Sequence, residues 1–144
     1  MRFANTVTID RAPGDVFAYL AQFENVPRWN YAIAETRKVS NGPVGVGARY
    51  LQLRTVPNRS EETFEVVEFE PDRRLVIRGQ IGPFSGDIAY QLDGAAIATV
   101  LTNTCDLRAH GPLSVVTPLL TRQVKSAVSA NLDVLKQILE RDHA

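Results

Sequence analysis

Residues 84–108 read FSGDIAYQLDGAAIATVLTNTCDLR, and this stretch decides the fold. Two runs of β-favouring residues, 84–93 and 97–108, meet at Asp93 and Gly94, a dipeptide that is a strong hairpin signal. A connector this short favours antiparallel neighbours, because a parallel pair needs a crossover of about a dozen residues or more. The stretch therefore predicts two adjacent strands of an antiparallel sheet.

The β pattern continues upstream of this hairpin. Further strands are predicted at residues 3–10, 36–40, 49–56, 61–69 and 75–80. Proline and glycine separate most of these runs, as expected because proline is excluded from central strands and glycine permits tight turns. The sheet should therefore have about seven strands.

Two short helical segments are expected between the first and second strands. Pro13 suits a first helical turn, and four apolar residues follow it at helical spacing: Val16, Phe17, Leu20 and Ala21. Residues 25–30 predict a second short turn. Together they form a helix pair that can close one end of a curved sheet.

Residues 112–141 predict one long amphipathic helix, whose first turns Pro118 should break or kink. We expect one side of it, from about residue 116 to 139, to pack against the sheet through Leu120, Val124, Val128, Leu132 and Leu135. The element order is then β-α-α-β-β-β-β-β-β-α. It predicts a single α+β domain over residues 1–144, in which a curved antiparallel sheet wraps around a long C-terminal helix.

Composition excludes several classes of protein. The chain has 144 residues, 44% of them apolar and 22% charged, which argues for one folded domain and against disorder. Sixteen basic and sixteen acidic residues give a net charge of zero, unlike a general nucleic-acid binder. The longest apolar run, 16–21, is too short to span a bilayer, and the N-terminus turns polar too soon for a signal peptide. A single cysteine excludes an internal disulfide, so we expect a soluble, cytoplasmic protein without stable membrane insertion.

Four stretches and the closing helix resemble a known family. They are APGDVFAYL (12–20), VPRWN (26–30), VGVGARY (44–50) and VEFEPDRRL (67–75). In this order they resemble the START-like, or SRPBCC, superfamily, and within it the polyketide cyclase/dehydrase and lipid-transport group. The resemblance implies the START/Bet v 1-like helix-grip fold. It also implies a small hydrophobic partner, lipid-, polyketide- or aromatic-like, held between sheet and helix, although fold analogy does not settle chemistry.

Strand alternation indicates which side chains face the interior. In the last strand we place the more apolar set inward: Ile97, Thr99, Leu101, Asn103, Cys105 and Leu107. In the strand before it the inward set is Phe84, Gly86, Ile88, Tyr90 and Leu92. The inward face of 75–80 is less clear. For 49–56 two readings stay open: a plain core takes Leu51 and Leu53, whereas a ligand cavity takes Tyr50, Gln52 and Arg54.

These faces give the predicted ligand-binding residues, which are Trp29, Tyr50, Arg54, Arg78, Phe84, Tyr90, Asn103, Cys105, Leu120 and Val124. Trp29 is either a core plug or a lid over the cavity mouth. An inward Asn103 amide needs a hydrogen-bond partner, which could be a neighbouring group, a water or a ligand.

Catalytic and metal chemistry find little support. Cys105 has no histidine near it in sequence and is predicted to be a buried, inert thiol. His110 is expected in an exposed loop rather than as a general base, and His143, one residue from the C-terminus, is expected to be frayed. The Gly42–Gly47 stretch lacks the Lys-Ser/Thr ending of a phosphate loop. The catalytic residues are therefore left open, and no metal site or cofactor is predicted.

Three functions remain. The first is a binding module for a small hydrophobic ligand. The second is a metal-free cyclase or dehydratase, in which single polar residues such as Tyr50, Arg54, Arg78 or His110 polarise a ketone. The third is a protein-interaction domain with a collapsed cavity. The sequence leaves a homodimer open, and it leaves the ligand unidentified.

Overall fold

The computed structural model describes residues 1–109 and 117–141, which form a seven-stranded antiparallel sheet and four helical segments. The strands are β1 (Arg2–Ile9), β2 (Ile33–Lys38), β3 (Arg49–Arg54), β4 (Ser60–Glu70), β5 (Arg74–Ile81), β6 (Phe84–Ala95) and β7 (Ala98–Ala109). The helical segments are α1 (Pro13–Ala21), the 3-10 turn η1 (Phe23–Asn25), α2 (Val26–Trp29) and α3 (Pro118–Arg141).

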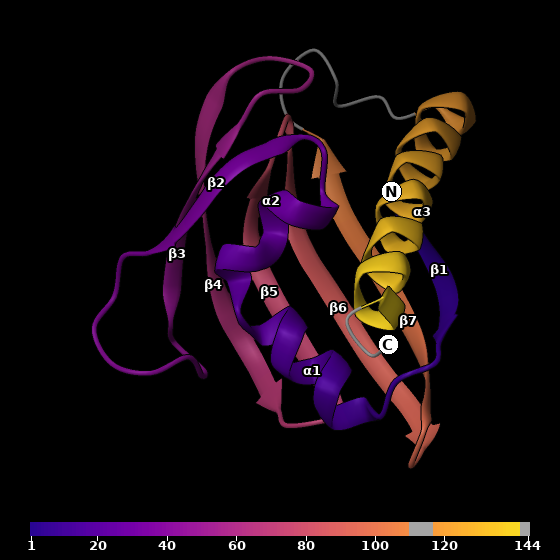
Figure 1. Ribbon diagram of the computed structural model, residues 1–144. Helices are drawn as coiled ribbons and strands as arrows, with labels where there is room; N and C mark the ends of the chain where they lie inside the picture. Colours follow the sequence, from indigo (N-terminus) through magenta and orange to yellow (C-terminus); the bar gives the residue numbers. More distant parts are fainter. Residues whose placement is uncertain (110–116, 142–144) are drawn as a thin grey trace.

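The sheet order is β1-β7-β6-β5-β4-β3-β2, and every neighbouring pair is antiparallel. Consecutive strands are neighbours from β2 to β7, as short connectors require, and β1 closes the other side against β7. The sheet curves, with α1 and α2 lying across its concave face and α3 running beside β1 (Figure 1). The predicted α+β architecture, a curved antiparallel sheet around a long C-terminal helix, is confirmed.

Two paired glycines let the strands approach closely in the middle of the sheet. Gly79 in β5 lies opposite Gly86 in β6, and Gly86 has a φ of 152°. A Cβ atom at Gly86 would collide with the carbonyl oxygen of Asp106, and one at Gly79 with that of Thr63. A residue with a side chain would push these strands apart, so the glycines permit the tight packing of β4 to β7.

The hairpin between β6 and β7 turns later than the Asp93–Gly94 signal predicts. Asp93 pairs with Val100 inside the ladder, and the turn is made by Ala96 and Ile97. A Cβ at Gly94 would collide with the carbonyl oxygen of Ala98, so this glycine serves a close strand approach rather than the turn. Ile97, assigned inward by alternation, is 81% exposed in the turn, and that assignment is wrong.

The long helix begins at Pro118 rather than being broken by it. Proline is favoured in the first turn of a helix, because its missing N–H needs no intrahelical partner there. The Thr117 hydroxyl accepts a hydrogen bond from the Leu120 backbone N–H at 3.1 Å, which caps this end. The predicted kink is therefore wrong, and the predicted helical residues 112–116, like His110, lie outside the described residues.

The second half of α3 packs into the main core. Leu132, Leu135 and Leu139 are buried there with residues of α1 and the sheet. Lys136 Nζ donates to the carbonyl oxygen of Thr8 at 2.7 Å, and Arg11 Nη1 donates to that of Leu139 at 2.7 Å. These contacts fasten the helix end to β1 and the segment that follows it.

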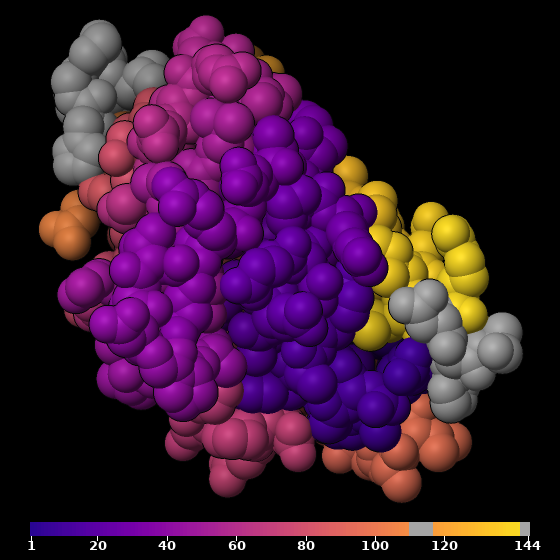
Figure 2. Space-filling view, turned by 60° about the vertical axis from the view of Figure 1, so that its left-hand side comes forward, coloured from indigo at the N-terminus to yellow at the C-terminus, as the bar shows by residue number. Residues whose placement is uncertain are grey.

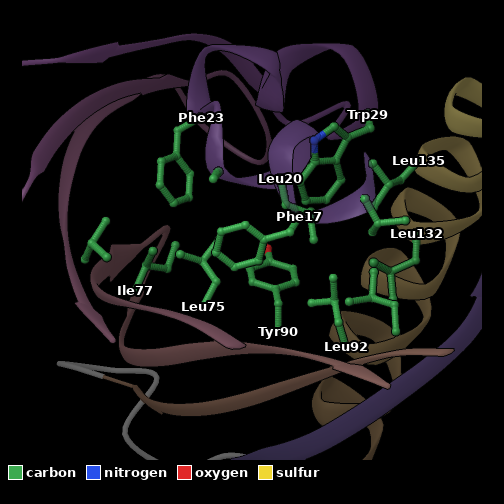
Figure 3. Packing of buried hydrophobic residues seen from close by; sticks show 14 of the residues in the cluster. Phe17, Leu20, Phe23, Trp29, Leu75, Ile77, Tyr90, Leu92, Leu132 and Leu135 are labelled. Carbon is green, nitrogen blue, oxygen red and sulfur yellow. The ribbon is translucent and has the colours of Figure 1, made fainter. Parts of the chain in front are cut away.

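The short helices close the other side of the concave face. Figure 2 shows them, in indigo, between the strands β2 and β3 in purple and helix α3 in yellow. Phe17, Leu20 and Phe23 point from these helices onto Leu75, Ile77 and Leu92 of the sheet (Figure 3). The interior is therefore solid beneath α1, and the remaining space lies toward the first half of α3.

Candidate functional site

A cavity of about 420 Å³ lies between the sheet and the first half of α3. Small-molecule sites commonly occupy about 300–1,000 Å³, so the cavity has the size of a ligand pocket. Its walls come from α2 and the residues after it, the ends of β3 and β5, the strands β6 and β7, and helix α3. Where α3 covers this space, Leu120, Val124 and Val128 are only half-buried.

Most of the predicted ligand-binding residues meet at this cavity. Those in its lining are Trp29, Arg54, Phe84, Tyr90, Asn103, Cys105, Leu120 and Val124. They come from α2, three strands and α3, so no short segment could have revealed the site. Tyr50 and Arg78 lie elsewhere.

Arg78 lies on the convex, outer face of the sheet. Its Nε donates to Asp87 Oδ1 at 2.7 Å, and its side chain is 63% exposed. This hydrogen bond holds the pKa of the Asp87 carboxyl below its usual value. The prediction that Arg78 lines the cavity is wrong, because Leu75 and Ile77 take the inner face of β5 and Arg78 has the opposite parity.

The strand β3 turns its polar set inward. Tyr50, Gln52 and Arg54 are buried, whereas Leu51 and Leu53 are half-buried on the outer face. This settles the two readings of 49–56 in favour of Tyr50, Gln52 and Arg54. Tyr50 is nevertheless a core residue.

Tyr50 packs within an aromatic cluster away from the cavity. Its ring stacks on Phe64 with 5.2 Å between centroids, and it lies 4.8 Å from the ring of Phe23. Burial, and secondarily the charge of Glu24, raises the pKa of Tyr50 to about 12. The phenol is therefore neutral at physiological pH and packs as part of the core.

Arg54 forms a buried ion pair that the sequence interpretation missed. Its Nη2 donates to Glu62 Oε1 at 2.8 Å and its Nε donates to Oε2 at 3.0 Å, and Glu62 is only 2% exposed. Gln52 Nε2 donates to Glu62 Oε1 at 2.7 Å, and the Gly82 backbone N–H donates to Oε2 at 2.8 Å. The carboxylate is thus fully hydrogen-bonded, and the charge of Arg54 is matched within the wall.

The alternation of residues in β4 already indicates that Glu62 lies on the buried face. Glu62 shares parity with Phe64 and Val66, both of which are buried. A carboxylate on a buried face needs a cation or several donors. Gln52 lies directly opposite Glu62 in the sheet, and Arg54 follows two residues later on the same face.

Trp29 is a core residue that also borders the cavity. It belongs to the main core cluster and is 7% exposed, yet it also lines the cavity. Its ring meets Tyr90 edge-to-face, with 6.4 Å between centroids and an interplanar angle of 85°. Both side chains point into the same interior space (Figure 3).

Asn103 and Cys105 satisfy each other and the backbone. Asn103 Nδ2 donates to the carbonyl oxygen of Ala89 at 3.2 Å, and the Cys105 thiol donates to Asn103 Oδ1 at 3.5 Å. The Asn103 amide therefore needs no ligand to avoid an unpaired polar group. Burial raises the pKa of the Cys105 thiol to about 12, so it is protonated and unreactive at neutral pH, as predicted.

Two other kinds of site have no candidate in the described residues. Within 1–109 and 117–141, no three His, Cys, Asp or Glu side chains gather as a metal ion would require. Over the same ranges, no helix is both long and apolar enough to cross a membrane.

Comparisons with solved structures agree on the fold. A START superfamily protein from Mycobacterium smegmatis matches with a TM-score of 0.83 at 13% identity, covering 97% of both chains. The ZhuI aromatase/cyclase from Streptomyces sp. R1128 matches with a TM-score of 0.77 at 17% identity, covering 100% of this chain and 96% of that one. A protein from Thermus thermophilus matches with a TM-score of 0.77 at 14% identity over 100% of both chains.

The family of this chain is identified by a match to a sequence model of that family. A comparison with curated proteins gave no match. The model of the family described as polyketide cyclase / dehydrase and lipid transport matches residues 1–140, nearly the whole chain. These findings confirm the resemblance seen in the sequence and the START-like helix-grip fold. The chain belongs to the polyketide cyclase/dehydrase and lipid-transport family.

Proposed function

We propose that this protein binds one small, largely apolar molecule in the cavity between the sheet and the first half of α3. The observation that carries the proposal is the gap in packing along that helix. Leu132 and Leu135 are fully buried in its second half, whereas Leu120, Val124 and Val128 face an open space of about 420 Å³. Natural cores are close-packed, so a space of this size under apolar side chains suits a ligand.

The cavity lining supports binding because it combines apolar walls with a few polar groups. Phe84, Ile88, Leu120 and Val124 supply apolar surface, while Tyr90 and other neutral polar residues offer hydrogen bonds. A filled interior would have favoured the interaction domain instead. Membership of a family whose description includes lipid transport points the same way.

The lining gives less support to a cyclase or dehydratase. Burial raises the pKa of the Tyr90 hydroxyl and the Cys105 thiol, so neither is a base at neutral pH. Arg54, the strongest candidate for polarising a ketone, is held by Glu62. Binding therefore stands ahead of catalysis.

A neutral fluorescent probe tests the proposal. N-phenylnaphthylamine should bind the folded protein saturably at one molecule per chain, and the emission of Trp29, the single tryptophan, should fall as the probe binds. Val124→Trp should abolish this binding by filling the cavity, with little loss of stability because the new ring occupies empty space.

Val134→Trp is the matched control, since Val134 lies on the same helix but is 40% exposed. It should leave probe binding unchanged. Unimpaired binding in a folded Val124→Trp protein would place the site elsewhere. A badly destabilised Val124→Trp protein, together with no binding to the wild type, would support a collapsed interior.

A further inference from the structure

One charged side chain, Arg54, is present among the described residues that line the cavity. Its guanidinium is bound by Glu62 through Nε and Nη2, and its Nη1 donates to the carbonyl oxygen of Val56 at 3.4 Å. Arg54 is 9% exposed and Glu62 2%, so water screens this pair little. The described wall therefore carries a cation and an anion whose charges cancel.

The carboxylate that neutralises Arg54 is locked in place. Gln52 and the backbone of Gly82 hold the two oxygens of Glu62 from other directions, at 2.7 and 2.8 Å. A ligand anion at the remaining N–H groups of Arg54 would meet a guanidinium whose charge Glu62 already neutralises. Taking the Nε and Nη2 donors from Glu62 would leave that carboxylate buried without its cation, which is strongly unfavourable.

Neutral hydrogen-bonding groups open onto the cavity instead. The hydroxyl of Tyr90 and the side-chain amide of Asn131 form no hydrogen bond with the described residues. In the same residues, the Tyr19 hydroxyl is the one unpartnered polar side-chain atom that is sealed from the surface. The Tyr90 and Asn131 groups are therefore accessible, and both belong to the cavity lining.

These two groups offer complementary chemistry. Burial raises the pKa of Tyr90, so its hydroxyl remains protonated and can donate a hydrogen bond. The Asn131 amide, on α3, can both donate and accept. Tyr90 stands on the sheet and Asn131 on the helix, so the cavity has neutral hydrogen-bonding groups on two of its walls.

We propose that the cavity selects an uncharged apolar molecule carrying a hydrogen-bonding group, such as an amide, alcohol or ketone, and discriminates against the corresponding carboxylate. This inference rests on the proposed function. A carboxylate entering the cavity would lose its hydration and meet no unpaired cation among the described lining residues, whereas a neutral polar group loses far less on burial. Selection by charge thus follows from the Arg54–Glu62 pair.

Matched pairs of probes test this selection. Naphthalene carboxamide and naphthalene carboxylate have nearly the same shape and differ in charge, and decanamide with decanoate repeats the comparison on a flexible chain. Binding of each is measured by titration calorimetry at neutral pH. At least one amide should bind about tenfold or more tightly than its carboxylate, a difference typical of uncompensated charge burial.

Glu62→Gln should weaken the discrimination against carboxylates, because it removes the negative charge that neutralises Arg54 with little change in side-chain shape. Carboxylate affinity should rise by about tenfold or more in this variant. Asp87→Asn is the matched control: Asp87, whose side chain is 37% exposed, is the partner of Arg78 on the outer face, and its substitution should not alter either affinity. The double variant Arg54→Gln/Glu62→Gln removes both charges and should keep the preference for amides, which provides a test if Glu62→Gln does not fold.

The outcomes separate this inference from the proposed function. Equal or tighter binding of the carboxylates to the wild type would overturn charge selection while leaving cavity binding intact. A folded Glu62→Gln protein with unchanged carboxylate affinity would also overturn it, as would a folded double variant that prefers carboxylates. If none of the four probes binds the wild type, the inference fails, and binding of N-phenylnaphthylamine decides separately whether the proposed function stands.

Discussion

Arg54 and Glu62 show what a single buried pair contributes. Three residues, Gln52, Arg54 and Gly82, donate hydrogen bonds to the Glu62 carboxylate. Removing water from two charges is costly, and their mutual attraction and added hydrogen bonds roughly offset that cost. The pair as a whole need not stabilise the fold, but loss of one member leaves the other buried without compensation.

Arg54→Ala should therefore lower the free energy of unfolding by about 3–5 kcal/mol, because it strands the Glu62 carboxylate. Arg78→Ala, which breaks the exposed pair with Asp87, should lower it by about 1 kcal/mol or less. Urea denaturation followed by circular dichroism measures both. Equal effects of the two substitutions would mean that Glu62 is not isolated from water as described.

Single residues were predicted with uneven success, because strand alternation shows which residues share a face but not which face is the inner one. In β7 one face is clearly more apolar, and the inward placement of Asn103 and Cys105 is confirmed by their burial. In β5 Leu75, Val76 and Ile77 are all buried, so hydrophobicity alone did not show the direction of Arg78. The Glu62 partner of Arg54 needed the β3–β4 register, which no local pattern contains.

The two halves of helix α3 have different surroundings. Leu132, Leu135 and Leu139 anchor its second half in the core, while the cavity is covered by its first half and, near the middle of the helix, by Asn131 and Leu132. A continuous apolar stripe predicted the buried side of the helix correctly. The stripe could not show that one half of it packs in the core and the other faces the cavity. Helical periodicity indicates which side of a helix faces the sheet, but not how far away the sheet lies.

Leu132→Ala should lower the free energy of unfolding by about 2–5 kcal/mol, since the residue is 2% exposed and packs in the main core cluster, although it also borders the cavity. Val124→Ala should cost about 1 kcal/mol or less, because its side chain already borders empty space. The midpoint and slope of urea unfolding measure both. A cost for Leu132→Ala near that of Val124→Ala would contradict the division of α3 into two halves.

Element boundaries depended on how proline and glycine were interpreted. Pro118 suits either a kink or a helix start, and the Thr117 cap makes it the start. Gly94 suits either a turn or a close strand approach, and the ladder shows the approach. In both cases the residue type was informative, but its role depended on neighbouring backbone contacts.

At the scale of the whole molecule, the cavity is the part of the space over the concave sheet that neither the short helices nor the second half of α3 fills. The short helices fill the part beneath α1 with aromatic and aliphatic side chains, and the second half of α3 fills the part beside β1 (Figure 3). The remaining part is left open under Val124 and Leu120. Element order was enough to predict this architecture. Whether the interior is filled depends on summed side-chain volumes, which the order does not give.

Native mass spectrometry of the protein purified from its own host tests the central claim most directly. We predict that the wild type carries one small molecule per chain, that Val134→Trp keeps it, and that Val124→Trp loses it while remaining folded. A bare wild-type mass under conditions that preserve non-covalent complexes, or the same adduct on Val124→Trp, would contradict binding in this cavity.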